Sequence, residues 1–98
     1  MPNTIDLHDA TFKGLEVDWK IGSCVVSLVT ANHPDCALIF AGMKKLQITR
    51  ELEWGMSCSV NHFKERSKGE FELELQSGDR LYIESQICTF ELARPVKV

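Results

Sequence analysis

The chain has 98 residues, the length of one ordinary domain, and carries 11 Lys and Arg against 14 Asp and Glu, a net charge of −3. This acidic balance excludes a nucleic-acid surface built from clustered Lys and Arg, so nucleic acid is not expected as a partner. The hydrophobic share of 44% and the charged share of 26% are those of a globular protein rather than of a disordered chain.

The first residues, 1–6, lack the basic start and apolar stretch of a secretory signal, and no segment reaches the roughly 18 apolar residues of a membrane span. The sequence therefore predicts a cytoplasmic protein without a membrane partner. Four cysteines are spaced by 12, 22 and 30 residues, which fits neither a disulfide framework nor a metal knuckle. We expect free thiols, most of them packed in the core: Cys24, Cys36, Cys58 and Cys88.

Alternation of apolar and polar residues with a period of two predicts an all-β protein, with a first hairpin over residues 15–19 and 24–29. A four-residue connection over 20–23 places three apolar pairs on one face, namely Trp19 with Cys24, Val17 with Val26, and Leu15 with Leu28. The pairing predicts that Trp19 is a core residue.

Turn formers over residues 31–35 predict a connecting loop, followed by a third strand over 36–41 that is apolar on both faces. Gly42 is expected to end this strand. A separate strand over 45–50 then alternates again, which predicts that Leu46 and Ile48 point inward.

The best-defined register lies in the segment 60–85. A three-residue loop, Ser67–Gly69, with glycine in the left-handed conformation, pairs basic with acidic residues on one face and apolar residues on the other. The predicted pairs are Arg66 with Glu70, Lys64 with Glu72, His62 with Glu74, and Phe63 with Leu73. The charged pairs are expected to lie on a solvated face, where they specify strand pairing, and His62 is expected to be a proton partner of Glu74.

A turn over 76–80 predicts a further hairpin with Leu75 opposite Leu81 and Leu73 opposite Ile83. Beyond it the alternation changes phase over 85–87, which predicts a bulge or a strand that switches sheets. Together these elements predict one domain, 1–98, of about eight strands joined by meander hairpins. We expect an antiparallel β-sandwich or a flattened barrel.

The sequence lacks the spacings of common catalytic and metal sites. His8, His33 and His62 are too far apart in sequence to share a strand or helix face, and no nucleophile elbow or glycine-rich phosphate loop occurs. We therefore expect no catalytic residue, no cofactor and no metal site. The leading hypothesis is a non-enzymatic protein that binds another protein.

Trp54 follows two acids and precedes a glycine at a connection between strands, where an aromatic side chain either caps a sandwich or anchors a partner. Several acids have no partner within their own segment, and they would be suited to a basic protein surface. The candidate partner-binding residues are Trp54, Glu51, Glu53 and Asp18.

Two alternatives stay open. One is a small-ligand or metal-binding protein that could also be an enzyme, with a cavity near His8, Asp9 and the cysteines. For His8 and Asp9 a strand-ending turn, in which Asp9 accepts backbone N–H groups, is the simpler interpretation. The other alternative is a homodimer formed by pairing of sheet edges.

Four segments carry a resemblance to a known group of proteins: Leu7–Ala10, Val17–Trp19, Trp54–Ser57 and Leu75–Asp79. With these segments the chain resembles small uncharacterised bacterial proteins of about this length, some of which look like predicted immunity proteins of bacterial toxin systems. The resemblance implies a cytosolic, single-domain, all-β protein that binds another protein. It implies no catalytic residues.

Overall fold

The computed structural model describes residues 7–30, 35–51 and 58–91, and within them every regular element is an antiparallel strand. The strands are β1 (Thr11–Asp18), β2 (Ser23–Val29), β3 (Cys36–Ile48), β4 (Val60–Ser67), β5 (Glu70–Leu75) and β6 (Arg80–Glu91). They form one sheet in the order β1-β2-β3-β6-β5-β4. The all-β prediction is confirmed. The described residues give six strands in one open sheet, not the eight of the expected sandwich or barrel.

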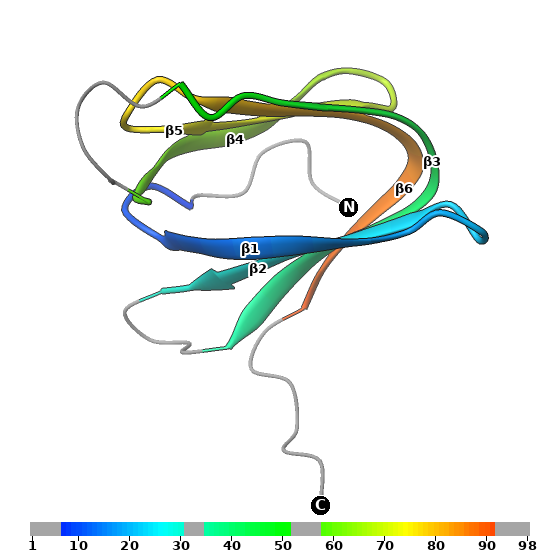
Figure 1. The fold of residues 1–98 in the computed structure, drawn as a ribbon, viewed down its shortest axis with the longest axis horizontal. Helices are drawn as coiled ribbons and strands as arrows, with labels where there is room; N and C mark the ends of the chain where they lie inside the picture. Colours follow the sequence, from blue (N-terminus) through cyan, green and yellow to red (C-terminus); the bar gives the residue numbers. More distant parts are fainter. Residues whose placement is uncertain (1–6, 31–34, 52–57, 92–98) are drawn as a thin grey trace, which may run out of the picture.

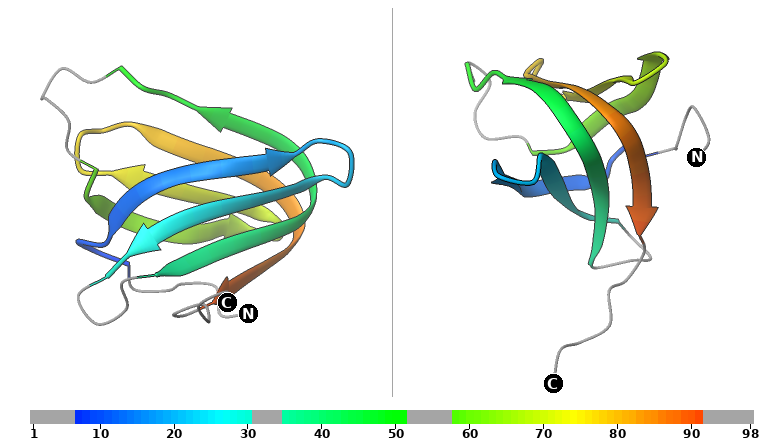
Figure 2. Two further views of the ribbon diagram at one scale, coloured as in Figure 1. Left: turned by 60° about the horizontal axis from the view of Figure 1, so that its bottom comes forward. Right: turned by 90° about the vertical axis from the view of Figure 1, so that its right-hand side faces the viewer.

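The sheet is strongly curved, because its two long central strands bend. In Figures 1 and 2, β3 and β6 run side by side through the bend, so that β1 and β2 lie across from β4 and β5. The two edge strands meet at one end, where the N–H of Phe12 donates to the carbonyl of Cys58 at 2.7 Å and that of Val60 to Ala10 at 2.7 Å. A single sheet thereby encloses a core from two sides.

The bend in β3 occurs at Gly42, which was expected to end the strand. Gly42 has a φ of +67°, and the pairing of β3 with β6 shifts between Met43 and Lys45. Because the bulge absorbs the change of direction, β3 continues to Ile48 instead of stopping. Beyond the bulge, Ile48 is 47% exposed, so its predicted inward orientation is wrong.

The bend in β6 lies where the alternation was predicted to change phase. Ser85 and Cys88 are both buried, whereas the two residues between them, Gln86 and Ile87, are exposed. The predicted phase change over 85–87 is confirmed, and the irregularity lies across from the bulge of β3.

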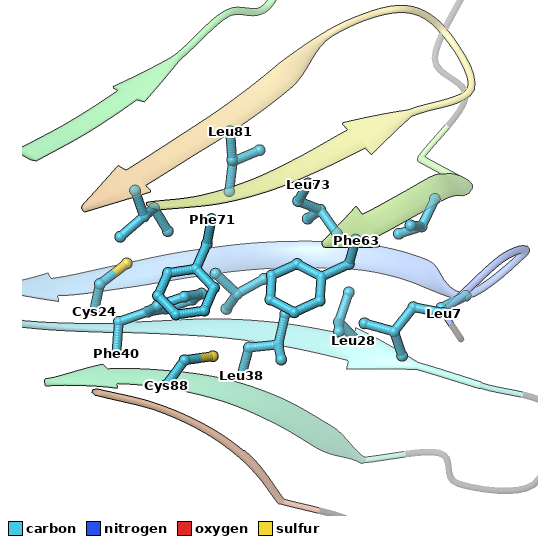
Figure 3. Close-up of a cluster of buried hydrophobic side chains, with 14 of the residues drawn as sticks. Leu7, Cys24, Leu28, Leu38, Phe40, Phe63, Phe71, Leu73, Leu81 and Cys88 are labelled. Atoms are coloured by element: carbon cyan, nitrogen blue, oxygen red, sulfur yellow. The ribbon is translucent and has the colours of Figure 1, made fainter. Parts of the chain in front are cut away.

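The core is built on three aromatic rings from different strands, shown in Figure 3. The ring of Phe40 meets those of Phe71 and Phe63 edge-on, with centroids 5.4 and 6.4 Å apart, and Phe63 stacks on Phe71 at 6.1 Å. Aliphatic side chains and three thiols fill the remaining space. The prediction that most cysteines are free and buried is confirmed, because all four are free thiols and three of them, Cys24, Cys36 and Cys88, are buried. Cys58 is exposed.

The β1–β2 hairpin forms with a register that differs by two residues from the predicted one. Asp18 pairs with Ser23 and Val17 with Cys24, so the four-residue turn is Trp19–Gly22 rather than 20–23. The turn forms here because Gly22, its last residue, adopts the left-handed conformation with a φ of +70°. Trp19 thus lies in the turn and is 88% exposed, so its prediction as a core residue is wrong.

The β4–β5 hairpin follows the predicted register over most of its length. Three predicted pairs are confirmed: His62 with Glu74, Phe63 with Leu73, and Lys64 with Glu72. Gly69 is left-handed as expected, with a φ of +81°. Near the turn a bulge between Glu65 and Ser67 places Ser67, not Arg66, opposite Glu70.

The β5–β6 hairpin differs by two residues from the predicted register, as the first hairpin does. Leu73 lies opposite Leu81, and Glu74 opposite Arg80. The turn ends earlier than predicted, because the N–H of Leu75 donates to the carbonyl of Asp79 at 2.8 Å and extends the strand pairing to these two residues. The predicted pair of Leu75 with Leu81 is therefore wrong, although the same side chains face the core.

Candidate functional site

The two most exposed large apolar side chains of the described residues lie at the β1–β2 turn, next to a third that is partly exposed. Trp19 is 88% exposed, Ile21 71% and Val17 40%. These three residues, which we call the turn surface, lie at the end of a hairpin that projects beyond the bend of β3 and β6 (Figure 1). An indole that is 88% exposed, two residues from an isoleucine that is 71% exposed, is a candidate interaction site.

Hydrogen bonds within the turn and one to β3 hold the backbone that carries the turn surface. The carboxylate of Asp18 accepts the N–H groups of Lys20 and Ile21 at 3.2 and 3.4 Å, and the N–H of Gly22 donates to the Asp18 carbonyl at 3.0 Å. The Gly22 carbonyl accepts the N–H of Met43 from β3 at 2.8 Å. The exposed side chains are therefore presented on an ordered backbone.

A shallow hollow of about 640 Å³ runs from the turn surface onto β3. Apolar side chains from β1, the turn and β3 form most of its wall, and lysines complete it. Its lining consists of Val17, Trp19, Gly22, Met43, Lys44, Lys45 and Leu46. The opposite side of the turn carries a second depression, whose lining includes the acids Glu16 and Asp18. The turn surface thus separates a basic side from an acidic side.

A separate cluster of charges surrounds the carboxylate of Glu72 on β5, which is only 6% exposed. Arg66 Nη1 donates to Glu72 Oε1 at 2.9 Å, and His62 Nε2 lies 3.2 Å from Glu72 Oε2. His62 Nδ1 lies 3.2 Å from Glu74 Oε1, which confirms the predicted contact of these two residues. Arg80 contacts both carboxylates, at 4.0 and 3.3 Å. The cluster joins β4, β5 and β6.

The electrostatics of this cluster are those of a structural ion-pair network. Burial alone would raise the pKa of Glu72, but the hydrogen bond from His62 and the charges of Arg66 and Arg80 outweigh burial and hold that pKa below its ordinary value. Arg66 and Arg80 thus face a Glu72 carboxylate that stays ionised. The arrangement fixes three strands.

Two of the four predicted partner-binding residues, Asp18 and Glu51, lie within the described residues. Trp54 and Glu53 lie outside the described residues. Asp18 holds the β1–β2 turn, and Glu51 follows β3, where its N–H donates to the carboxylate of Asp79 at 2.7 Å. Of the two that the structure describes, Asp18 lies beside the turn surface.

Of the residues of the ligand or metal alternative, His8 and Asp9 lie side by side, with His8 Nε2 3.6 Å from Asp9 Oδ1. His8 donates from Nδ1 to the carbonyl of Asn61 at 2.9 Å, and Asp9 occupies a turn with a φ of +71°. The Asp9 carboxylate accepts the side-chain amide of Gln76 at 2.8 Å rather than the predicted backbone N–H groups. Over residues 7–30, 35–51 and 58–91, no three His, Cys, Asp or Glu side chains are placed to share a metal ion.

The buried thiols are kept protonated. Burial, with a smaller effect of Glu65, raises the pKa of Cys88 to about 12, and burial also raises the pKa of Cys24. Because the thiolate is the reactive form, these two side chains act as packing groups.

Sequence reasoning missed the turn surface because it placed Trp19 in a strand. The signal was present in the spacing of Asp18 and Gly22, since an Asp directly before a turn and a Gly at its last position delimit the four residues Trp19–Gly22. The described part of the chain contains no helix long and apolar enough to cross a membrane. No protein-family model, curated protein or solved structure matches the chain.

Proposed function

We propose that this protein is a non-enzymatic binding protein that recognises another protein through the turn surface. The observation that carries the proposal is the 88% exposure of Trp19 on an ordered turn beside Ile21. Trp is among the residues that most often dominate binding energies at interfaces. Burying one indole removes about 150–250 Å² from water, which corresponds to about 4–6 kcal/mol before the costs of association.

The ordered backbone favours the same use. Hydrogen bonds to Asp18 and from Met43 already hold the turn, so a partner would not have to order it on binding. The resemblance to predicted toxin-immunity proteins suggests one form of this function, in which the partner is a toxin. Under the proposal the anchor is Trp19 instead of Trp54. Asp18 contributes by holding the turn on which Trp19 lies.

The proposal is tested by comparing three immobilised forms of the full chain: wild type, Trp19→Ala and Ile87→Ser. Ile87 is 57% exposed on β6 and serves as the matched control, because it is apolar and exposed but lies outside the turn surface. Proteins captured from cells that make this protein, quantified by mass spectrometry, should be lost with Trp19→Ala and kept with Ile87→Ser.

Two outcomes would overturn the proposal. Equal capture by Trp19→Ala and wild type would remove the turn surface from recognition. Sedimentation of the purified wild type as a dimer, with Trp19→Ala as a monomer, would show instead that a second copy of the chain covers the turn surface.

A further inference from the structure

We infer that the segment bound at the turn surface is acidic, with an Asp or Glu next to an apolar side chain. This inference rests on the proposed function and concerns the chemistry of the partner. The apolar side chain would lie in the hollow against Trp19 and Met43, and the acid would meet Lys44 or Lys45 at its rim.

The charges around the hollow carry the inference. Among the described residues, two lysines and no acid line it, although acids outnumber bases in the chain by 14 to 11. Of these two lysines, Lys44 forms no ion pair among the described residues, and the ammonium of Lys45 lies 5.8 Å from the centre of the Tyr82 ring. By contrast, the arginines of the Glu72 cluster are committed to carboxylates. The lysines Lys44 and Lys45 next to an apolar wall complement an acidic, apolar segment.

The acids on the other side of the turn favour a protein segment over an anionic lipid surface. Glu16 and Asp18 line the depression that adjoins Val17 and Trp19 from the opposite side. A membrane surface broad enough to receive the projecting turn would meet both sides and would be repelled by these acids. A narrow peptide can occupy the basic side alone.

The test is a selection of peptides from a random phage-displayed library on the immobilised full chain. Enriched peptides should carry Asp or Glu beside Leu, Ile, Phe or Trp. A synthetic peptide of this kind should bind the double variant Lys44→Glu/Lys45→Glu at least about tenfold more weakly than wild type, because the rim would then repel it. The matched control, Lys64→Glu/Lys68→Glu, reverses two exposed lysines on the β4–β5 hairpin and should bind as wild type does.

The other outcomes separate the two proposals. Enriched apolar peptides without acids that still require Trp19 would overturn the acidic partner and leave the proposed function intact. Peptides that bind Trp19→Ala as tightly as wild type would overturn the proposed function. Failure to enrich any peptide would count against both proposals. Binding to vesicles of phosphatidylserine and phosphatidylcholine that is lost in Trp19→Ala would replace the protein segment by a lipid surface.

Discussion

Glu72 shows how one side chain can be buried and charged at the same time. Its carboxylate is almost removed from water, yet Arg66, Arg80 and His62 surround it. His62 faces a carboxylate with each ring nitrogen, Glu72 with Nε2 and Glu74 with Nδ1, each at 3.2 Å. The cluster therefore joins β4, β5 and β6 through charges rather than apolar contact alone.

We expect Glu72→Gln to lower the free energy of unfolding by about 1–2 kcal/mol, because it weakens charge-assisted hydrogen bonds while an amide oxygen can still accept one from Arg66. Glu16→Gln, at an exposed position on β1, is the control and should leave stability unchanged. Urea unfolding of the three proteins measures the difference. Equal midpoints and slopes for all three would contradict the structural role of the cluster.

The same carboxylate predicts how stability depends on pH. The pKa of Glu72 in the folded state lies below its ordinary value of 4.5, so its contribution is fully present above that value and is lost as the pH falls through the folded-state pKa. Asp79 acts in the same direction, because the N–H of Glu51 above all, with Thr49 and Ser77, lowers its pKa against the effect of burial.

Stability should therefore fall below pH 4.5 in wild type and fall less steeply in Glu72→Gln, which lacks one of the two acids. Thermal unfolding followed by circular dichroism across this acidic range gives both slopes. Parallel curves for the two proteins would show that Glu72 titrates alike in the folded and unfolded chains.

At the residue scale, the sequence predicted which side chains are apolar but not which of them are exposed. Trp19 and Trp54 are equally hydrophobic, and Trp19 was assigned to the core because it continues the alternation of Leu15 and Val17. Its exposure depends on where the turn begins, which Asp18 and Gly22 decide. The contact of His62 with Glu74 was predictable because it follows from strand register.

At the element scale, the bend of β3 is the feature that brings the two ends of the sheet together. Gly42 adopts a φ of +67°, and a Cβ at this position would lie 2.9 Å from the side chain of Gln86. A residue other than glycine would have to hold the left-handed conformation and displace that side chain. The glycine that looked like a strand end is thus the place where the strand turns.

Gly42→Ala should lower the free energy of unfolding by about 1–2 kcal/mol, the typical cost of the left-handed conformation for a residue with a Cβ. Gln47→Ala, at an exposed position of the same strand, is the control and should have little effect. The double variant Gly42→Ala/Gln86→Ala removes the side-chain contact but keeps the backbone strain. If Gly42→Ala unfolds at the wild-type urea concentration, the bend does not depend on glycine.

Two hairpins had predicted registers that were wrong by two residues, and the error has one cause. A slip of two residues keeps every side chain on its own face, so the alternation of apolar and polar residues does not reveal it. The turn residues decide the register, through the left-handed conformation of Gly22 in the first hairpin and the hydrogen bond from Leu75 to Asp79 in the last. In the β4–β5 hairpin the charges added a second constraint, and there most predicted pairs are confirmed.

At the scale of the whole molecule, a single sheet forms a closed core because its edges touch at one end. Backbone hydrogen bonds join Phe12 to Cys58 and Val60 to Ala10, and Gln76 reinforces the contact by donating to the carboxylate of Asp9. The sequence predicted strands that could form a sandwich or a barrel but not this partial closure. Contact between segments so distant in the chain leaves no local pattern.

If this contact belongs to the cooperative fold, the amide protons of Phe12 and Val60 should exchange with solvent only on global unfolding. Those of Lys20 and Ile21, in the exposed turn, should exchange faster by local opening. Native-state hydrogen exchange followed by NMR compares the four amides directly. Exchange of Phe12 and Val60 at the rate of the turn amides would mean that the two edges separate readily.

The central claim is that Trp19 is exposed in the free protein and buried by a partner. In a Trp54→Phe variant Trp19 is the single tryptophan, so its fluorescence can be followed alone. The free variant should emit like a water-exposed indole and be quenched readily by acrylamide. Adding the selected acidic peptide or the captured protein should shift the emission to shorter wavelengths and protect it from the quencher. Unchanged emission and quenching at saturating partner would contradict the claim.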